Sequence, residues 1–386
     1  MKKNDLNYEK IHKALNLFDL KVPKSKKFTQ LLKLLYSPEE AEVIAHFGLP
    51  YFYAEVPEVT AEKTGKSKEE VETLFAGMVG RGTLFSQKSP KGETEYTLPP
   101  FIPGIYEFYT MSRNDPAEKK KEILKILDDY FFETFVPDAF NASEYPWFRV
   151  LPAEISVKRL IAVNDDVEPE SRVLPFETAS EYISSAKYIA VGPCACRDHA
   201  AIQDGKRRCD KPMDVCLVFD KVAEYWAEKK IGRLISHEEA VEVLNISAKA
   251  GLVHCTTNNQ TFGEHMSGMI CNCCPCCCFI LQGVLKTRGQ QGLAQSNFSP
   301  VIDKNNCNLC KKCIKECPVD ALYHHKPHLD DQSDNFVALN EKECLGCGVC
   351  TNVCSENAMT MKKVRNDIPE VDVLHLGNRH SIMKKH

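Results

Sequence analysis

The sequence has no run of about 18 apolar residues, the length that an α-helix needs to cross a membrane. Its first residues are polar and lead into Leu6, Asn7 and Tyr8 without an apolar core, so no signal peptide is expected. Basic charge is not in excess either, since 49 Lys and Arg stand against 53 Asp and Glu, a net charge of −4. We therefore expect no membrane span and no general attraction to nucleic acid or anionic membranes.

The glycine-rich fingerprints of nucleotide-binding proteins are also missing. No Gly-x-Gly-x-x-Gly run occurs. Thr64-Gly65-Lys66-Ser67 is not a phosphate-binding loop, because Thr60 stands where the first glycine of that loop is needed. Nicotinamide binding and nucleotide hydrolysis are therefore unsupported, although motifs alone do not exclude a flavin.

Cysteine, in contrast, is abundant, with nineteen in 386 residues. Without a secretory signal, so many cysteines are expected to be metal ligands rather than disulfides. Because thiolates and exposed clusters are sensitive to oxygen, we expect an anaerobic cytoplasm as the location. Eight cysteines lie between Cys307 and Cys354, and the other eleven lie between Cys194 and Cys278.

The C-terminal eight form two runs of the same spacing, in which three cysteines follow one another at every third position and a fourth comes four residues later. Each run is the pattern that holds a [4Fe–4S] cluster, with the fourth cysteine of one run ligating the cluster of the other. The first predicted ligand set is Cys307, Cys310, Cys313 and Cys354. The second predicted set is Cys344, Cys347, Cys350 and Cys317. Zinc is the alternative for Cys-x-x-Cys pairs, and two complete copies of the run argue against it.

This stretch resembles the bacterial two-cluster ferredoxin domain. It departs from that pattern in two ways, since Ser355 replaces the proline after Cys354 and a long polar connection, residues 324–335, joins the halves. Neither departure removes a ligand. Residues 322–325 and 336–340 are predicted to form the two strands of a hairpin around the connection.

The middle cysteines fall into two candidate sets along the sequence. The first is Cys194, Cys196, Cys209 and Cys216. The second is Cys271, Cys273, Cys274, Cys276, Cys277 and Cys278, which is too dense for ordinary core packing. We expect one or two further iron–sulfur clusters here, because electron transfer needs closely spaced centres and [4Fe–4S] clusters are predicted in the adjacent C-terminal domain. Zinc binding and disulfide storage are the alternatives.

Several residues near these sets are candidates for supporting roles. Arg197, Arg207 and Arg208 are expected to stabilise thiolates or a negative cluster. His254 and Cys255 are a mixed ligand pair, an active thiol, or a plain buried cysteine beside a histidine. Helix-then-strand patterns around residues 177–191 and 238–255 predict an α/β layer with thiols at the strand ends, where such layers usually bind ligands.

The N-terminal 112 residues predict helices, then a hairpin, and this order resembles a winged helix-turn-helix domain. Fifteen basic and fifteen acidic residues make it neutral. Glu69, Glu70 and Glu72 begin the helix that would meet DNA, where phosphates repel them. We therefore expect a module that contacts other proteins or forms a homo-oligomer by dimerisation, and we expect no DNA binding.

The segments 192–197, 270–278 and 295–298, together with the ferredoxin runs, resemble a family of multi-cluster iron–sulfur proteins of anaerobic bacteria and archaea. The resemblance covers roughly residues 150–362 and implies 4Fe–4S cofactors, but it implies little about a substrate. The predicted fold class is a multidomain α+β chain. Its parts are a winged-helix-like domain (1–112), a helical connector (113–150), a cysteine-rich α/β domain (151–300), a two-cluster ferredoxin domain (301–363) and a basic tail (364–386).

The predicted function is electron transfer within an anaerobic oxidoreductase system, together with a redox partner protein. One alternative is a reductase whose reaction site is a middle-domain cluster or thiol. A second is a redox- or iron-sensing transcription regulator that uses the winged helix, and a third is a metal-storage or scaffold protein.

Overall fold

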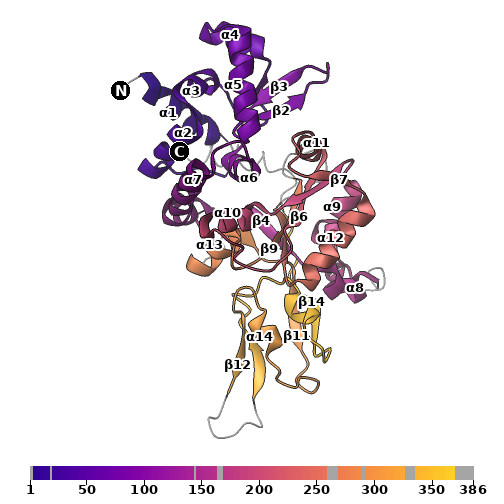
Figure 1. The fold of residues 1–386 in the computed structure, drawn as a ribbon. Coiled ribbons are helices and arrows are strands. Elements are labelled where there is room, and N and C mark those ends of the chain that lie inside the picture. The colour runs from indigo at the N-terminus through magenta and orange to yellow at the C-terminus, as the bar shows by residue number, and fades with distance from the viewer. Residues whose placement is uncertain are drawn as a thin grey trace, which may run out of the picture.

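The computed structural model describes residues 3–17, 20–142, 145–162, 168–258, 268–287, 292–326 and 335–369. Most of the polar connection and residues 370–386 of the predicted basic tail lie outside this described part. Figure 1 shows an elongated molecule, with a helical N-terminal part, a central sheet and a small C-terminal domain at the opposite end. No helix in the described part of the chain is long and apolar enough to span a membrane.

The N-terminal part consists of five helices and a small antiparallel sheet of strand order β1-β3-β2. Its elements are α1 (Lys3–Leu15), α2 (Lys26–Leu35), α3 (Pro38–Ile44), β1 (Ala54–Glu55), α4 (Pro57–Thr64), α5 (Lys68–Arg81), β2 (Phe85–Lys88) and β3 (Thr94–Thr97). Ser37 and Ser67 begin α3 and α5 with complete capping boxes. The predicted helices and hairpin are therefore present, while the winged-helix identity stays a prediction.

Helical segments connect this part to the central sheet, and one apolar core runs through both. The segments are η1 (Phe101–Ile105), α6 (Tyr106–Met111), α7 (Ala117–Tyr130) and η2 (Phe131–Phe140). The rings of Phe131 and Phe279 lie 4.4 Å apart, and those of Phe85 and Tyr225 lie 4.3 Å apart. The same core cluster continues to Val349 in the C-terminal domain, so the three parts share buried surface.

The central sheet has seven strands in the order β10-β4-β8-β9-β6-β5-β7. These are β4 (Phe148–Leu151), β5 (Ile189–Pro193), β6 (Asp214–Phe219), β7 (Arg233–Ile235), β8 (Val253–Thr257), β9 (Met269–Cys273) and β10 (Leu293–Ala294). The accompanying helices are α8 (Glu154–Ala162), η4 (Pro169–Ser171), η5 (Pro175–Glu177), α9 (Ala179–Ser185), α10 (Ala195–Asp204), α11 (Asp220–Glu228), α12 (His237–Lys249) and α13 (Phe279–Thr287).

The pairing of these strands differs from the predicted α/β layer. All neighbouring strands run antiparallel except β10 and β4. The two helix–strand patterns are real, since α9 precedes β5 and α12 precedes β8. Their strands are separated in the sheet by β9 and β6, however, so the cysteines do not gather at one common edge of parallel strands. They meet instead through antiparallel register, in which Gly192 is opposite Cys216 and Cys255 is opposite Cys271.

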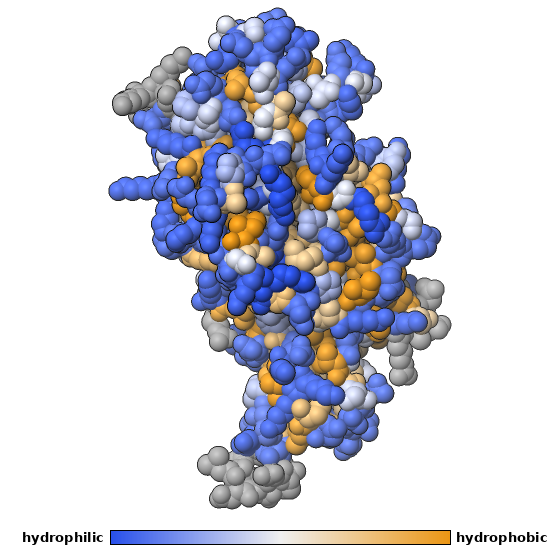
Figure 2. All heavy atoms as spheres, viewed as in Figure 1, coloured by the Kyte–Doolittle hydropathy of each residue, from blue (hydrophilic) through white to orange (hydrophobic). Residues whose placement is uncertain are grey.

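The C-terminal domain repeats one small unit twice. Its elements are β11 (Phe298–Ile302), α14 (Lys312–Lys315), β12 (Leu322–His325), β13 (Phe336–Leu339), α15 (Val349–Asn352) and β14 (Met359–Lys363). β11 pairs with β14, and β12 pairs with β13, both antiparallel. The predicted hairpin is thereby confirmed. Figure 2 shows hydrophilic residues over much of the visible face of the molecule, with apolar residues between them.

A buried ion pair fixes the C-terminal domain to the central part. The Lys363 Nζ lies 3.0 Å from the Glu177 Oε2, and the two side chains are only 4% and 1% exposed. The Asn297 Nδ2 donates to the other carboxylate oxygen at 2.5 Å. Nearby, the backbone N–H of Ala153 donates to the carbonyl of Cys347 at 3.1 Å. These contacts hold the second ferredoxin run against the sheet.

Replacing Lys363 with methionine should lower the free energy of unfolding by about 3–5 kcal/mol, because the Glu177 carboxylate would remain buried without its partner. Urea unfolding of the metal-loaded protein measures the change. The matched control is Lys362→Met, at an exposed neighbouring position, which should change stability by less than about 0.5 kcal/mol. Equal effects of the two substitutions would contradict a stabilising role for the pair.

Candidate iron–sulfur and metal sites

The first predicted ferredoxin set surrounds one cavity. Cys307, Cys310, Cys313 and Cys354 all line a space of about 20 Å³. Cys307 and Cys310 lie on the loop before α14, Cys313 lies on α14 itself, and Cys354 follows α15. Cys310 is exposed, whereas Cys313 is buried, and burial raises the pKa of Cys313. The structure thus brings together the fourth cysteine of one run and the first three of the other, which is the arrangement a two-cluster ferredoxin requires.

The second predicted set surrounds a second cavity of about 20 Å³, lined by Cys317, Cys344, Cys347 and Cys350. Burial raises the pKa of Cys344, Cys347 and Cys350, so these thiols ionise most readily when a metal replaces the proton. The N–H of Ala321 donates to the Cys317 sulfur at 3.3 Å, and the N–H of Gly346 donates to the Cys344 sulfur at 3.4 Å. Such donors also stabilise cluster-bound sulfur. Both cavities therefore fit [4Fe–4S] clusters in their donors.

Gly346 should be indispensable to the second set. It adopts φ +68°, and an added Cβ would collide with the carbonyl oxygen of Phe298 and the hydroxyl of Ser296. Gly346→Ala is therefore expected to remove about four irons per chain by displacing the loop that carries Cys344 and Cys347. Iron analysis checks this. Gly92→Ala is the control, because Gly92 has a similar φ of +82° but no atom within 4 Å of an added Cβ. It should keep all its iron.

The structure regroups the middle cysteines, which corrects the first candidate set. Cys209 is separated from Cys194, Cys196 and Cys216 and joins the second set. The reason is long-range strand pairing. Cys216 lies on β6 opposite Gly192, which is close to Cys194 in the chain. Cys209, in contrast, lies on the loop after α10, which brings it to the turn after β9.

Six cysteines of the middle part line one buried cavity. We call them the cysteine ring: Cys194, Cys196, Cys216, Cys271, Cys273 and Cys278. They surround a mostly apolar cavity of about 60 Å³. Hydrogen bonds link neighbouring thiols, for example Cys194 with Cys196 and Cys216 with Cys271. The bond from Cys196 lowers the pKa of Cys278 to about 7. Burial raises the pKa of Glu107, which also lines the cavity, to about 8.

Cys255 lies between the cysteine ring and the second ferredoxin set. It is buried on β8, hydrogen-bonds to Cys273 of the ring, and interacts electrostatically with Cys347. All three belong to the same apolar core. A mixed His254–Cys255 ligand pair, one of the three alternatives, is disfavoured because successive side chains of a strand point to opposite faces. The Nδ1 of His254 lies 2.5 Å from the Asn272 side-chain oxygen, and burial lowers its pKa.

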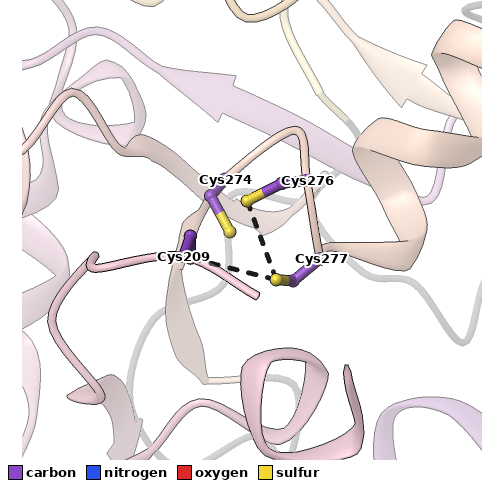
Figure 3. A group of neighbouring side chains, drawn as sticks. All are labelled: Cys209, Cys274, Cys276 and Cys277. Carbon is purple, nitrogen blue, oxygen red and sulfur yellow. Dashed lines mark hydrogen bonds between the residues drawn. The ribbon is translucent and has the colours of Figure 1, made fainter. Parts of the chain in front are cut away.

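The remaining four cysteines form what we call the compact set, shown in Figure 3: Cys209, Cys274, Cys276 and Cys277. Their sulfurs all lie within 4.8 Å of one another. The Cys277 sulfur is 3.9 Å from that of Cys209 and 3.7 Å from that of Cys276. Figure 3 shows that three of the side chains come from one turn and that Cys209 approaches from a separate segment.

The three candidate arginines behave differently. Arg197 is buried and donates to the Cys274 sulfur at 3.5 Å and to the Asn272 carbonyl at 3.2 Å. Arg208 donates to the Cys276 carbonyl at 3.2 Å. Arg207 donates instead to the carbonyl of Lys211. The first two therefore place positive charge beside the middle thiols, as predicted, whereas the bond of Arg207 goes to a backbone carbonyl outside both groups of cysteines.

An open cavity next to both middle sites was not foreseen. It has a volume of about 350 Å³ and is lined by Cys196 of the ring and Cys277 of the compact set, together with Asp128, His199 and Arg208. The Nε2 of His199 lies 3.2 Å from an Asp128 carboxylate oxygen. The i, i+3 spacing of Cys196 and His199 indicates that both side chains lie on one face of a helix. The residues that α7 adds to the cavity could not be predicted in this way, because their position depends on tertiary packing.

Comparisons with known proteins concern the C-terminal domain. Residues 299–355 match the family model described as a 4Fe-4S dicluster domain. The ferredoxin-type protein NapH of Escherichia coli is 35% identical over 81 residues, which are 21% of this chain and 25% of NapH. Pyruvate synthase subunit PorD of Methanocaldococcus jannaschii is 34% identical over 70 residues, 18% of this chain and 71% of PorD. Ferredoxin-3 of Nostoc sp. is 31% identical over 80 residues, 18% of this chain and 82% of that ferredoxin.

These matches confirm the ferredoxin prediction for the C-terminal domain. The chain spans only a quarter of the length of NapH, and no solved structure matches it. Iron–sulfur electron transfer is the function common to the dicluster model and the ferredoxins. Through its C-terminal domain, the chain belongs to the family of ferredoxins with two [4Fe–4S] clusters.

Proposed function

We propose that the C-terminal domain exchanges single electrons with a redox partner protein, and that these electrons reach a further iron–sulfur centre held by the cysteine ring. When bound, [4Fe–4S] clusters supply one-electron chemistry at low potential. The observation that carries the proposal is the position of Cys255, buried between the ring and the second ferredoxin set in one continuous core. A short, dry path is what electron transfer between the two sites requires.

The chain's own residues contribute ligation, burial and charge. The first ferredoxin set faces the exterior through exposed Cys310, and the charged residues lining its cavity are Lys311, Lys312 and Glu356. The net positive charge of this lining favours a partner with an acidic docking surface. The second set is buried against the sheet, and its loop is held there by Ala153 and by Ser156, whose hydroxyl donates to the Gly348 carbonyl at 3.0 Å. Cys307, Cys310, Cys313 and Cys354, the outer set, would therefore hold the cluster that exchanges electrons with the partner. Cys317, Cys344, Cys347 and Cys350, the inner set, would hold the cluster nearer the cysteine ring.

The name of PorD makes it a subunit of pyruvate synthase. By analogy, we propose that this chain is a component of an anaerobic oxidoreductase system. The N-terminal part would then provide contacts to other proteins or to a second copy of the chain. Its helix α5 begins with exposed Glu69, Glu70 and Glu72, and Lys68 is already paired with Glu58 at 2.6 Å. That acidic start supports protein contact over DNA contact.

Stopped-flow reduction of the anaerobic protein tests whether electrons reach the ring through the inner set. Cys347→Ser should slow reduction of the ring centre by a protein donor at least tenfold, because the inner set is disrupted. Dithionite, which does not need the docking surface, should still reduce the ring centre in the variant. Unchanged reduction by the protein donor, or a ring without any redox centre, would contradict the proposal.

A reductase is the second candidate, and the open cavity favours it. That cavity brings solvent and a small molecule to Cys196 and Cys277, beside the buried His199. A reductase would show oxidation of the reduced chain by a small acceptor without any partner protein. His199→Gln should slow that oxidation and leave transfer to a partner protein unchanged. If no small acceptor oxidises the reduced chain faster than buffer does, the reductase candidate is excluded.

A further inference from the structure

We propose that the compact set, Cys209, Cys274, Cys276 and Cys277, binds a single tetrahedral metal ion and no iron–sulfur cluster. The ligand chemistry is that of a thiophilic divalent ion, zinc or iron, held by four thiolates. This site is separate from the electron path through the cysteine ring, and the inference does not rest on the proposed function.

The spacing of the sulfurs carries the inference. Four thiolates around one ion, each at about 2.3 Å, lie about 3.8 Å from one another at the corners of a tetrahedron. The measured separations of 3.9 Å between Cys209 and Cys277, and of 3.7 Å between Cys276 and Cys277, match that edge. A cubane spreads its ligands over a larger tetrahedron, because each sulfur binds a different iron and inorganic sulfide lies between the irons.

The ferredoxin sets provide an internal comparison. Each of them also has four cysteines, but those four surround a cavity. Within the described ranges, the compact set is the only group of three or more potential ligands whose ligand atoms all lie within 4.8 Å. The same chain therefore shows two arrangements of four thiols, an open one where a cubane is predicted and a closed one here.

The surroundings supply what a charged four-thiolate site needs. Four thiolates around a divalent ion carry a net charge of about −2, which burial makes unfavourable without compensation. Arg197 is only 3% exposed and donates to the Cys274 sulfur at 3.5 Å. Arg208 donates to the carbonyl of Cys276 at 3.2 Å, and the Gln282 side-chain amide donates to the same carbonyl at 2.9 Å. These contacts hold the turn in its ligating shape.

The role of such an ion follows from the origin of the ligands. Cys209 lies on the loop between α10 and β6, and the other three lie on the turn between β9 and α13. Because all four positions are occupied by protein, no position is open for a substrate, which is typical of a structural site. The ion would fix the loop to the turn, and that turn also carries Cys278 of the ring.

Metal and acid-labile sulfide analysis of anaerobically purified Cys209→Ser tests the site. We expect the loss of one metal ion per chain and no loss of sulfide. Loss of one zinc assigns zinc, and loss of one iron without sulfide assigns iron. Cys310→Ser is the comparison, because this exposed ferredoxin cysteine should cost iron and sulfide together. Loss of about four irons with about four sulfides from Cys209→Ser, or no loss of metal, would overturn the proposal.

The unmodified chain gives a readout that does not depend on the variant folding. It should contain either one zinc, or one iron more than its sulfide. Zinc-free protein with equal iron and sulfide would also overturn the proposal, even if every ferredoxin signal were intact. Replacement of the ion by Co²⁺ should give the visible absorption of a tetrahedral cobalt thiolate, which Cys209→Ser should lack.

Discussion

Cys317→Ala should abolish the signal of the cluster bound by Cys344, Cys347 and Cys350, and should leave the cluster of its own run in place. The expected loss is about four irons per chain, the content of one cubane. The reason is spatial, since Cys317 lines the cavity of the second run and receives a hydrogen bond from Ala321 there. EPR spectra of the dithionite-reduced protein identify which cluster is lost.

The reciprocal exchange provides the control. Cys354→Ala should reproduce the spectrum of Cys310→Ala, because both residues line the outer cavity. Cys344→Ala should in turn reproduce the spectrum of Cys317→Ala. If each variant instead lost the cluster of its own run, the ligand exchange between the halves would be wrong.

Arg197→Leu should cost about 3–5 kcal/mol of stability in the metal-loaded protein and should release metal from the middle part. Arg197 is buried between the cysteine ring and the compact set and donates to the Cys274 sulfur and the Asn272 carbonyl. Although burial opposes it, attraction to the Cys194 and Cys274 thiolates raises the pKa of Arg197. Leucine would leave negative sulfur without a counter-charge. Urea unfolding and metal analysis measure the two effects.

Two further substitutions separate charge from local shape. Arg197→Lys keeps the positive charge but loses the fork that reaches both acceptors, so we expect partial loss of metal. Arg207→Leu removes a neighbouring arginine that donates to the Lys211 carbonyl, and it should change stability by less than about 0.5 kcal/mol. If Arg207→Leu and Arg197→Leu released the same metal, a specific role for Arg197 would be excluded.

The ferredoxin sites could be predicted from the sequence because their geometry is local. Each loop places three thiols a few residues apart, and the short helix after it carries the fourth across to the other half. The capped helices at Ser37 and Ser67 were predictable for the same reason. In these stretches, neighbouring residues determine the conformation, and distant parts of the chain only stabilise it.

The middle sites could not be divided correctly from the sequence, because distant segments assemble them. Six cysteines in eight residues look like one site, but strand β9 ends at Cys273 and a turn follows it. Cys271 and Cys273 then face the ring while Cys274, Cys276 and Cys277 face Cys209. This separation depends on the antiparallel order of the sheet, which no local pattern encodes. The open cavity was not predicted for a related reason, since its acidic residues come from the distant segments α7 and η2.

Acid-labile sulfide per chain, measured on protein purified without oxygen, decides whether the middle part holds a cluster. Three cubanes, two in the ferredoxin domain and one in the cysteine ring, give about twelve sulfides. About eight would show that the ring holds no cluster, and the proposed inward path for electrons would then be wrong.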